Sequence, residues 1–346
     1  MHRTQARLTL FSLLALLLAA CQHLATYKQS YLQFGTLIEV TVVSSQRKRV
    51  LAAFDAIDQL LERRHSDWHG WLDGDLSRFN LALQGNPADG VTVPPSLRRL
   101  IAESRIYYRL SGQRFNPALG KLIAAWGFHD NSRTDPQTIQ QIQQSIPGMD
   151  DLVIENNRAR SLNPHLQLDF GGIAKGLAIE EIAALLQQEQ LNNFIVNAGG
   201  DVFARGSKSG AAWRIAVEDP FAEGIIASIE LQPGQAVFTS GNYRRWFQDE
   251  GKPRRHHIID PRSGAPSEYI SSATVLHADP VRADAAATSL MLTHPDDIAQ
   301  VAHSLGIEQF VVITEDRRAY CSKPLCAHLK WLQDDRLEVE LLGVAG

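Results

Sequence analysis

The sequence lacks the short motifs that identify several large classes of enzyme. Its 346 residues contain no G-x-G-x-x-G, no G-x-x-x-x-G-K-[ST], no H-E-x-x-H and no G-x-S-x-G. These motifs bind dinucleotides, cradle nucleotide phosphates, hold catalytic zinc and present a nucleophilic serine, respectively. Their absence argues against a Rossmann enzyme, a P-loop NTPase, a zincin and an α/β-hydrolase.

Low-complexity linkers, repeats of fixed period and an excess of basic residues are also missing. The formal net charge is −4, and it becomes −6 if residues 1–20, which contain Arg3 and Arg7, are removed. An acidic protein is a poor ligand for nucleic acid, so we expect no nucleic-acid partner. Because no linker divides the chain, we expect one large domain or two closely packed lobes.

The first twenty residues have the pattern of a secretory signal. Arg3 and Arg7 precede an apolar run over 8–18 that ends in small residues and Cys21, and the run is too short to span a membrane as a mature helix. It resembles a bacterial lipoprotein signal, which implies an acylated Cys21, a periplasmic location and a lipid anchor. Gln22 in place of Asp favours the outer membrane. The alternative is an ordinary signal peptide whose last residue is Cys21.

Cysteine is scarce, with three residues at positions 21, 321 and 326. If Cys21 carries lipid, Cys321 and Cys326 remain as an even pair that could close a small loop in an oxidising compartment. Sequence does not give their Cα separation, so the disulfide stays open. A metal site of Cys321, Cys326 and His328 lacks a fourth ligand nearby.

The order of expected elements predicts an α+β fold with mostly antiparallel sheets flanked by helices. Residues 34–43 alternate as a strand does, and short strands parted by turn residues fill 193–277. Helical spacing is found over 49–64, 94–110, 134–146, 173–191, 281–292 and 295–305, and further strands are expected over 309–314 and 337–342. Strands grouped with strands indicate α+β architecture. We expect residues 21–32 to be a tether and 33–346 to be the folded domain.

Residues Leu168–Glu180, LDFGGIAKGLAIE, combine an expected strand end, a Gly-Gly turn, Lys175 and a helix start. Glycines let the main chain approach an anion, and the first turn of a helix presents unpaired N–H groups. The segment therefore predicts a phosphate site, although a tight connection without a ligand is the alternative.

Asp284 and Thr288 stand four residues apart in VRADAAATSLML, so a helix places both on one face. Carboxylate and hydroxyl oxygens are hard ligands that suit Mg²⁺. The alternative is a small-residue core helix in which Asp284 interacts with the helix dipole and Thr288 bonds its own turn.

Histidines and aromatic residues mark two further segments. His256 and His257 precede a short apolar strand, where an imidazole could donate to a phosphate or move a proton, or both could be plain loop residues. Trp68 and Trp71 are expected in a loop, where they could stack on a planar ring or cap the core.

Eight segments in chain order resemble the ApbE family of FAD:protein FMN transferases, from about Gln33 to His294. They are FGTLIEVTV, LSRFN, FNPALGKLIAAWGF, LDFGGIAKG, FIVNAGGDVFARG, AVFTSGNYRR, HHIIDPRSG and ADAAATS. The resemblance implies an ApbE-like fold with an FAD cleft between two intimate lobes. It also implies Mg²⁺-dependent transfer of FMN from FAD to a Thr or Ser hydroxyl of an acceptor protein through a phosphoester bond, with release of AMP.

The same resemblance implies the acceptor and the roles of individual residues. The acceptor would be a subunit of a membrane redox complex or a periplasmic flavoprotein, and its identity is not encoded here. Asp284, Thr288 and the Gly172 carbonyl would bind the metal, and His257 would lie beside the reacting phosphate. The residues implied for cofactor binding are Phe34, Trp71, Phe115, Asn116, Pro117, Asp169, Lys175, Gly199, Gly200, Asp201 and Ile258.

Two departures from the family pattern concern the flavin pocket. Phe34 replaces the usual Met, and Asn116-Pro117-Ala118 replaces Asp-Pro-Thr.

Two alternatives to FMN transfer also stay open. Water in place of the acceptor would make the protein a Mg²⁺-dependent FAD pyrophosphatase that yields FMN and AMP, and a site without turnover would make it an FAD-binding lipoprotein.

Overall fold

A nine-stranded sheet forms the centre of the molecule, in a computed structural model that describes residues 24–85, 87–128, 134–243, 246–247, 255–332 and 336–343. Neighbouring strands are antiparallel except for the parallel pair β17–β19. In order across the sheet the strands are β1 (Ala25–Gln33), β2 (Thr36–Ser44), β6 (Phe194–Ala198), β7 (Asp201–Arg205), β10 (Gln235–Gly241), β15 (Ile270–His277), β16 (Gln309–Thr314), β17 (Arg318–Ser322) and β19 (Glu338–Leu342).

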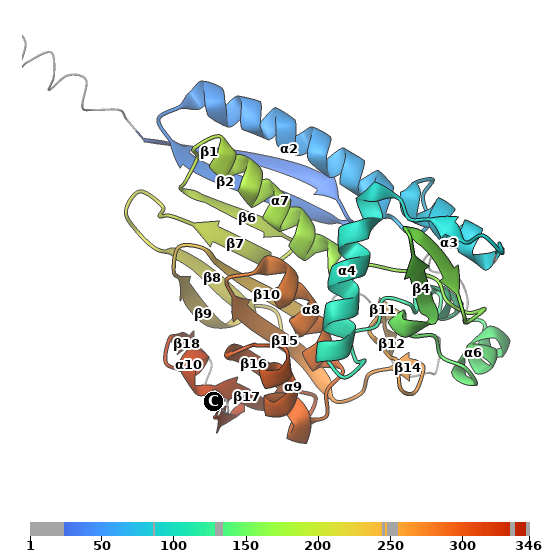
Figure 1. Cartoon of the computed structure of the whole chain (residues 1–346). Coiled ribbons are helices and arrows are strands. Elements are labelled where there is room, and N and C mark those ends of the chain that lie inside the picture. The colour runs from blue at the N-terminus through green and yellow to red at the C-terminus, as the bar shows by residue number, and fades with distance from the viewer. Residues whose placement is uncertain are drawn as a thin grey trace, which may run out of the picture.

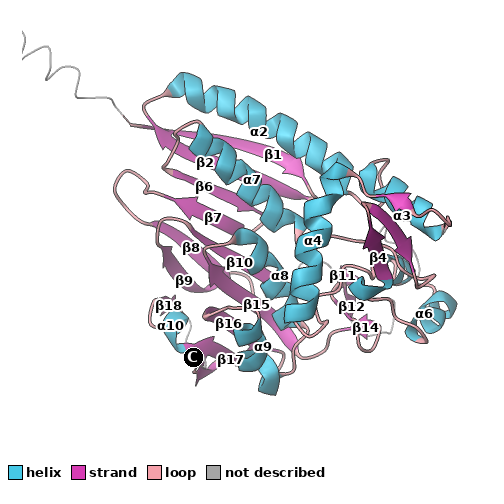
Figure 2. Cartoon of the chain, viewed as in Figure 1, coloured by secondary structure: helices cyan, strands magenta, loops and turns pink. Residues whose placement is uncertain are grey.

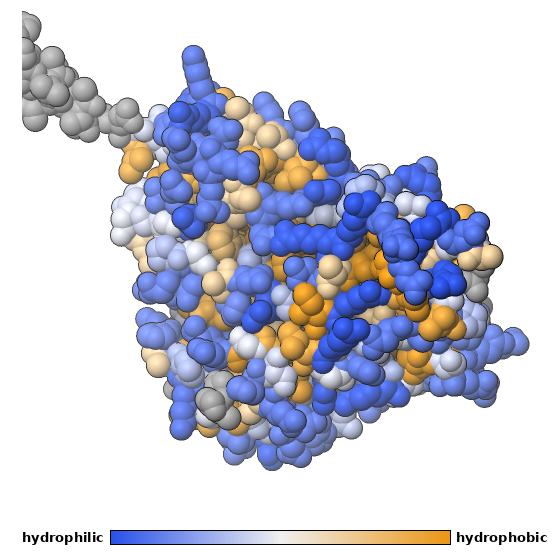
Figure 3. All heavy atoms as spheres, in the orientation of Figure 1, coloured by the Kyte–Doolittle hydropathy of each residue, from blue (hydrophilic) through white to orange (hydrophobic). Residues whose placement is uncertain are grey.

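Helices cover one face of this sheet (Figures 1 and 2). They are α2 (Arg47–Trp68), α4 (Pro95–Leu110), α7 (Ala174–Gln188), α8 (Pro280–Met291) and α9 (Ile298–Ser304). Their outer surface is mostly hydrophilic, and apolar side chains show mainly in the seams between elements (Figure 3). This separation of faces is what amphipathic helices on a sheet require.

The other face of the main sheet packs on a second sheet of β8 (Trp213–Glu218), β9 (Ile225–Leu231) and β18 (Leu329–Trp331). Alternate residues of the central strands point to opposite faces, as the period of two requires. Phe238 joins the core under the helices, whereas Val237 joins the core between the sheets. The central strands are therefore buried on both sides, and the predicted α+β architecture with mostly antiparallel sheets is confirmed.

A smaller region lies beside the helical layer, at the right of Figure 1. It contains α3 (Asp75–Gln84), α5 (Gly120–Ala125), α6 (Pro136–Gln143), β3 (Val91–Thr92), β4 (Leu152–Glu155), β5 (Arg158–Ser161), β11 (Trp246–Phe247), β12 (Arg255–His256), β13 (Ile259–Asp260), β14 (Ala265–Pro266) and the 3-10 turn Met149–Asp151. A separate small core that includes Leu122, Ile142 and Ile259 stabilises part of it. A further 3-10 turn, Pro295–Asp297, precedes α9, and α10 (Lys323–Cys326) follows β17.

The expected tether over residues 21–32 is wrong for most of its length. Residues 25–33 form β1, which pairs with β2 along its whole length. Of its nine residues only Tyr31 is buried, so the strand carries no alternating apolar pattern to reveal it. Cys21 and the lipoprotein signal lie outside the described residues, and none of the described helices is long and apolar enough to cross a bilayer.

Cys321 and Cys326 form a disulfide with a Cα–Cα distance of 6.0 Å. The bond joins β17 to α10, beside the core between the two sheets. No group of three or more His, Cys, Asp or Glu residues suited to a metal occurs in the described parts of the chain. The idea of a Cys321–Cys326–His328 metal site is therefore not supported.

The junction between β15 and α8 should make stability depend on pH. His277 Nδ1 accepts the N–H of Asp279 at 2.9 Å, and Asp279 caps α8 through its carboxylate. Burial and then Arg282 lower the pKa of His277 from its usual 6.5, against weaker opposing effects of Asp279 and Glu308. The unfolded chain then binds a proton that the folded chain does not, so this contribution to stability is present above pH 6.5 and falls as the pH drops towards the lowered pKa.

His277→Asn should remove that part of the pH dependence, because an amide oxygen can still accept the Asp279 N–H without titrating. The measurement is the thermal midpoint of both proteins at about pH 7.5 and about pH 5.5. We expect the wild type to lose more stability on acidification than the variant. Equal losses would show that His277 does not contribute.

Candidate functional site

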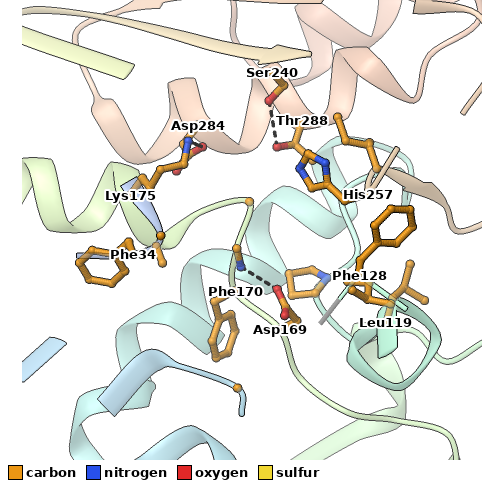
Figure 4. Close-up of a pocket in the computed structure, with 18 of the residues that line it drawn as sticks. Phe34, Leu119, Phe128, Asp169, Phe170, Lys175, Ser240, His257, Asp284 and Thr288 are labelled. Carbon is orange, nitrogen blue, oxygen red and sulfur yellow. Dashed lines mark hydrogen bonds and ion pairs between the residues drawn. The ribbon is translucent and has the colours of Figure 1, made fainter. Parts of the chain in front are cut away.

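A cavity of about 530 Å³ opens between the helical layer and the smaller region, within the size range of small-molecule sites. Figure 4 shows Lys175 and Asp284 facing each other on one side, His257, Phe128 and Leu119 on another, and Asp169 between the segments that line the wall. Its lining comes from distant parts of the chain: 34–36, 68–71, 114–119, 169–175, 198–199, 239–241, 257–259 and single residues of α5, α8 and their ends. The expected cleft between two lobes is therefore present.

Two tight turns of the main sheet form one wall. Phe34-Gly35 joins β1 to β2 and Gly199-Gly200 joins β6 to β7, with φ values of 54°, 68°, 63° and 99°. Positive φ at both central residues is what two-residue type I′ hairpins need. A Cβ on Gly199 would lie 2.2 Å from Thr36 Oγ1, so only glycine allows the two turns to pack together.

The Phe34 turn is held by an imidazole. The Phe34 N–H donates to His65 Nδ1 at 3.2 Å, and the Phe34 ring contacts His65 edge-on and Trp68 at a tilt, with centroid distances of 5.6 and 6.1 Å. Trp68 is the last residue of α2, so it lies on a helix and not in the predicted loop, and its buried side chain belongs to the core and also lines the cavity. Trp71 lines the cavity too, from the loop that follows.

The segment before α7 approaches the site without being a strand. Leu168–Gly172 has no regular partner strand, which corrects the expected strand end, and only an isolated bridge joins Gln167 to Leu119. Asp169 Oδ1 accepts the Gly171 N–H at 2.8 Å in a short side-chain turn. The segment then enters α7, whose second residue is Lys175.

Helix α8 brings Asp284 and Thr288 to the cavity on the same face, as their spacing predicted. Asp284 is 3 % exposed, and its Oδ2 accepts the N–H of Gly176 on α7 at 2.8 Å. The two helices touch closely at this point, because a Cβ on Gly176 would lie 2.6 Å from the Pro280 carbonyl oxygen and 3.0 Å from Asp284 Cβ. Gly176 thus sets the position of Asp284.

Two buried carboxylates share one lysine. Lys175 Nζ forms an ion pair with Asp201 Oδ2 and lies 3.9 Å from Asp284 Oδ1. The pKa of Asp284 is raised to about 6, chiefly by burial and also by Asp201, against the lowering effects of Lys175 and the Gly176 N–H. The negative charge of the pair exceeds the positive charge of Lys175, so the site favours a cation beside Asp284.

The oxygen groups around Asp284 fit Mg²⁺. A Cβ built on Gly172 would lie 3.2 Å from Thr288 Oγ1, so the Gly172 backbone approaches the Thr288 hydroxyl closely. Ser240 Oγ lies 3.4 Å from the same hydroxyl. Carboxylate, hydroxyl and carbonyl oxygens are the donors that Mg²⁺ takes, and a buried, incompletely compensated carboxylate gives it a charged partner.

Other residues implied to bind the cofactor take different positions. Phe115, Pro117 and Ile258 line the cavity. Asn116 also lines it, but its amide donates to Pro147 O at 2.9 Å and accepts from the Ala118 N–H at 3.1 Å, so it mainly holds the loop.

Gly200 and Asp201 are not part of the described lining. Asp201 accepts the Thr239 N–H at 3.0 Å and pairs with Lys175, so it acts behind the cavity surface.

The two adjacent histidines have separate tasks. His256 is buried, its Nε2 lies 2.6 Å from Ser267 O, and its Nδ1 accepts the Ile258 N–H at 3.3 Å. His257 lines the cavity, with its ring 6.5 Å from that of Phe128. The structure therefore favours His257 over His256 as the functional histidine. Arg244 and Arg245, in the segment that resembles the family motif, lie outside the described residues.

Several cavity residues were given no role at the sequence level, and Ser240, Phe128 and Arg114 are among them. Ser240 lies in TSGNYRR and Phe128 ends FNPALGKLIAAWGF, so a hydroxyl and an aromatic ring in family segments could have been noticed. Arg114 lines the cavity beside Phe115, and its guanidinium donates to Asp297 at 3.1 Å and to Ser111 O at 3.1 Å.

Comparisons with known proteins agree with this geometry. The model of the ApbE family matches residues 34–311. An FAD:protein FMN transferase of Rhodobacter capsulatus is 34% identical over 308 residues, which cover 87% of this chain and 58% of that protein. The chain thus spans less than two thirds of that relative's length. The FAD:protein FMN transferase of Vibrio cholerae is 29% identical over 320 residues, which cover 87% of this chain and 92% of the relative.

Solved structures show the same fold. The ApbE protein of Thermotoga maritima has a TM-score of 0.78 at 26% identity, covering 88% of this chain and 99% of that one. The flavin transferase ApbE of Vibrio cholerae has a TM-score of 0.76 at 27% identity, covering 88% of this chain and 100% of that one.

Proposed function

Because the chain belongs to the ApbE family, we propose that it transfers FMN from FAD to a Thr or Ser hydroxyl of an acceptor protein and releases AMP. The observation that carries the proposal is the meeting of Asp284, Thr288 and the Gly172 backbone at one cavity that also presents aromatic side chains. A cation-binding end suits the pyrophosphate of FAD, and aromatic walls suit its planar rings.

The proposed reaction is an in-line displacement at phosphorus. The acceptor oxygen bonds to the phosphorus on the FMN side, and the bond from that phosphorus to the bridging oxygen breaks. AMP leaves with the bridging oxygen, and the hydroxyl proton passes to a base at the site. Phosphoryl transfers of this kind depend mainly on positioning and electrostatics, so few residues need to react directly.

Asp284, Thr288 and the Gly172 carbonyl would hold Mg²⁺. When bound, the metal would neutralise charge on the pyrophosphate as a Lewis acid. Lys175 is set between Asp201 and Asp284, and its charge keeps two buried carboxylates tolerable in one wall. The Thr239 N–H donates to the Asp201 carboxylate and holds it in place, and Asp201 in turn holds Lys175 through their ion pair.

His257 and the aromatic residues would complete the site. We propose that His257 accepts the hydroxyl proton or donates to the phosphate, since it is the histidine on the cavity wall. Phe34, Trp71, Phe115 and Ile258 would contact the rings of FAD. Asp169 would help to bind FAD from the short turn that its side chain forms with the Gly171 N–H.

We also propose that the protein is periplasmic and anchored through lipid on Cys21, with an acceptor that is a membrane redox subunit or a periplasmic flavoprotein. The Cys321–Cys326 disulfide supports an oxidising compartment. The signal pattern over residues 1–21 supports the anchor.

The test is incubation of the full chain with FAD, Mg²⁺ and a candidate acceptor domain, followed by intact mass measurement and quantification of AMP. We expect an added mass of FMN on the acceptor and one AMP for each FMN transferred. AMP released equally without acceptor would instead identify an FAD pyrophosphatase. Intact FAD after long incubation would identify a carrier.

Thr288→Val should reduce the transfer rate by about 10- to 100-fold, because it removes one oxygen ligand and keeps the shape of the side chain. Ser289→Ala is the matched control on the same helix. The Ser289 hydroxyl is buried and donates to Ala285 O at 2.7 Å, and it does not line the cavity. Both variants should fold, and only Thr288→Val should need more Mg²⁺ for half-maximal rate. An equal effect of both variants would contradict the metal assignment.

A further inference from the structure

The segment that carries Asp169 and Gly172 depends on unusual support. It belongs to none of the described helices or sheets, although it contributes two residues of the proposed site. On one side, backbone groups of residues 117–120 bind it. The Asp169 N–H donates to Pro117 O at 2.8 Å, and the Gly120 N–H donates to Gln167 O at 2.7 Å. These bonds fix only one edge of the segment.

The other edge is fixed by the side chain of Asn80. The Leu168 N–H donates to Asn80 Oδ1 at 2.8 Å, and Asn80 Nδ2 donates to the Leu168 carbonyl at 2.9 Å. A carboxamide offers one acceptor and two donors in a plane, so it can replace the neighbouring strand that this edge lacks. The pair of bonds fixes both backbone polar groups of the residue that directly precedes Asp169.

Asn80 is itself firmly placed. It is 3 % exposed and lies on the buried face of α3 with Leu76, Phe79 and Leu83. Its partner lies 88 positions away in the chain, so the contact joins α3 to the cavity wall. The side chain does not line the cavity, and it therefore acts on any ligand only through the segment it holds.

We propose that Asn80 is a positioning residue that sets the place of the Asp169 carboxylate and the Gly172 carbonyl. The inference rests on the proposed function, because the proposed function assigns Asp169 to FAD and the Gly172 carbonyl to Mg²⁺. Loss of the clamp would let the segment move away from Thr288 and α8. Binding of FAD and the requirement for Mg²⁺ should then both weaken.

Asn80→Asp is the test variant. It keeps the acceptor for the Leu168 N–H and the size of the side chain, but it turns an oxygen towards the Leu168 carbonyl in place of a donor. Asn163→Asp is the matched control. Asn163 is buried, its Nδ2 donates to Ser145 O at 3.0 Å, and its Oδ1 accepts the His165 N–H at 2.9 Å. It holds the same connection five residues upstream of Leu168 and does not line the cavity.

Two measurements decide the proposal. The first is the Kd of FAD from flavin fluorescence in EDTA, where no Mg²⁺-dependent turnover occurs. The second is the Mg²⁺ concentration for half-maximal AMP release. Both variants should lower the thermal midpoint. Only Asn80→Asp should weaken FAD binding and raise the Mg²⁺ requirement, each by about 10-fold or more.

An Asn80→Asp protein that is destabilised like the control but keeps both values within about twofold would show that Asn80 is merely structural. If Asn80→Asp does not fold, Asn80→Gln keeps donor and acceptor on a longer side chain, and the same titrations apply to it. If the wild type binds FAD but modifies no acceptor, the proposed transfer is contradicted. The role of Asn80 is then decided by the Kd of FAD alone. A wild type that does not bind FAD would overturn both.

Discussion

Asp284→Asn is expected to reduce flavin transfer by more than about 100-fold, since even partners of metal ligands commonly contribute 10- to 100-fold. The substitution keeps the shape of the side chain and removes the charge that would hold Mg²⁺. Initial rates of FMN incorporation over a range of Mg²⁺ concentrations provide the measurement. Added Mg²⁺ should not restore the rate, because the charged ligand itself is missing.

The same variant should lose little or no stability when Mg²⁺ is absent. Asp284 is buried, and its pKa is raised chiefly by that burial, so the folded protein resists the ionised form. A neutral amide avoids this cost and still offers an oxygen to the Gly176 N–H. Thermal midpoints in EDTA would check this. A rate close to that of the wild type would contradict the metal assignment, and a large drop in the midpoint would show that the carboxylate serves the fold.

Gly176→Ala should destabilise the protein by about 1–3 kcal/mol and also reduce transfer, because added volume forces a tightly packed core apart. The new methyl carbon would lie 2.6 Å from the Pro280 carbonyl oxygen and 2.9 Å from Val281 Cα, both backbone atoms of α8. Helix α8 must therefore shift, and Asp284 moves with it. Chemical denaturation and the transfer assay measure the two effects.

Gly85→Ala is the control for the Gly176 variant. Gly85 caps α3 with a φ of −68°, and the nearest atom to a new Cβ would be the Ala82 carbonyl oxygen at 3.4 Å. Alanine fits this conformation, so stability should stay within about 0.5 kcal/mol or rise slightly. If Gly176→Ala behaved like Gly85→Ala, the close crossing of α7 and α8 would not be needed to place Asp284.

Local pattern predicted those parts of the site that one element carries. Asp284 and Thr288 share a face of α8 because the helical period places residues four apart together, and β16 over 309–314 matches its predicted bounds. The predicted Gly-Gly turn followed by a helix is present, although the turn follows an irregular segment and not the expected strand.

Contacts between distant residues could not be predicted in this way. Lys175 and Asp201 were both assigned to the nucleotide pocket, yet they pair with each other across 26 positions, and Asp201 stands behind the cavity surface. The clamp of Asn80 on Leu168 spans 88 positions. Such partners depend on how the elements pack, and α3, which carries Asn80, is not among the predicted helices.

If Cys21 carries lipid as proposed, strand β1 would limit how far the cavity lies from the membrane. The strand starts at Ala25, four residues after the proposed lipid-bearing Cys21, and extended chain covers at most about 14 Å over that distance. The nine residues of β1 span about 30 Å, and Phe34 at their end lines the cavity. In an anchored molecule, Phe34 on one wall of the cavity would therefore lie within about 45 Å of the bilayer surface, so the anchor would select acceptors by where they present a hydroxyl group.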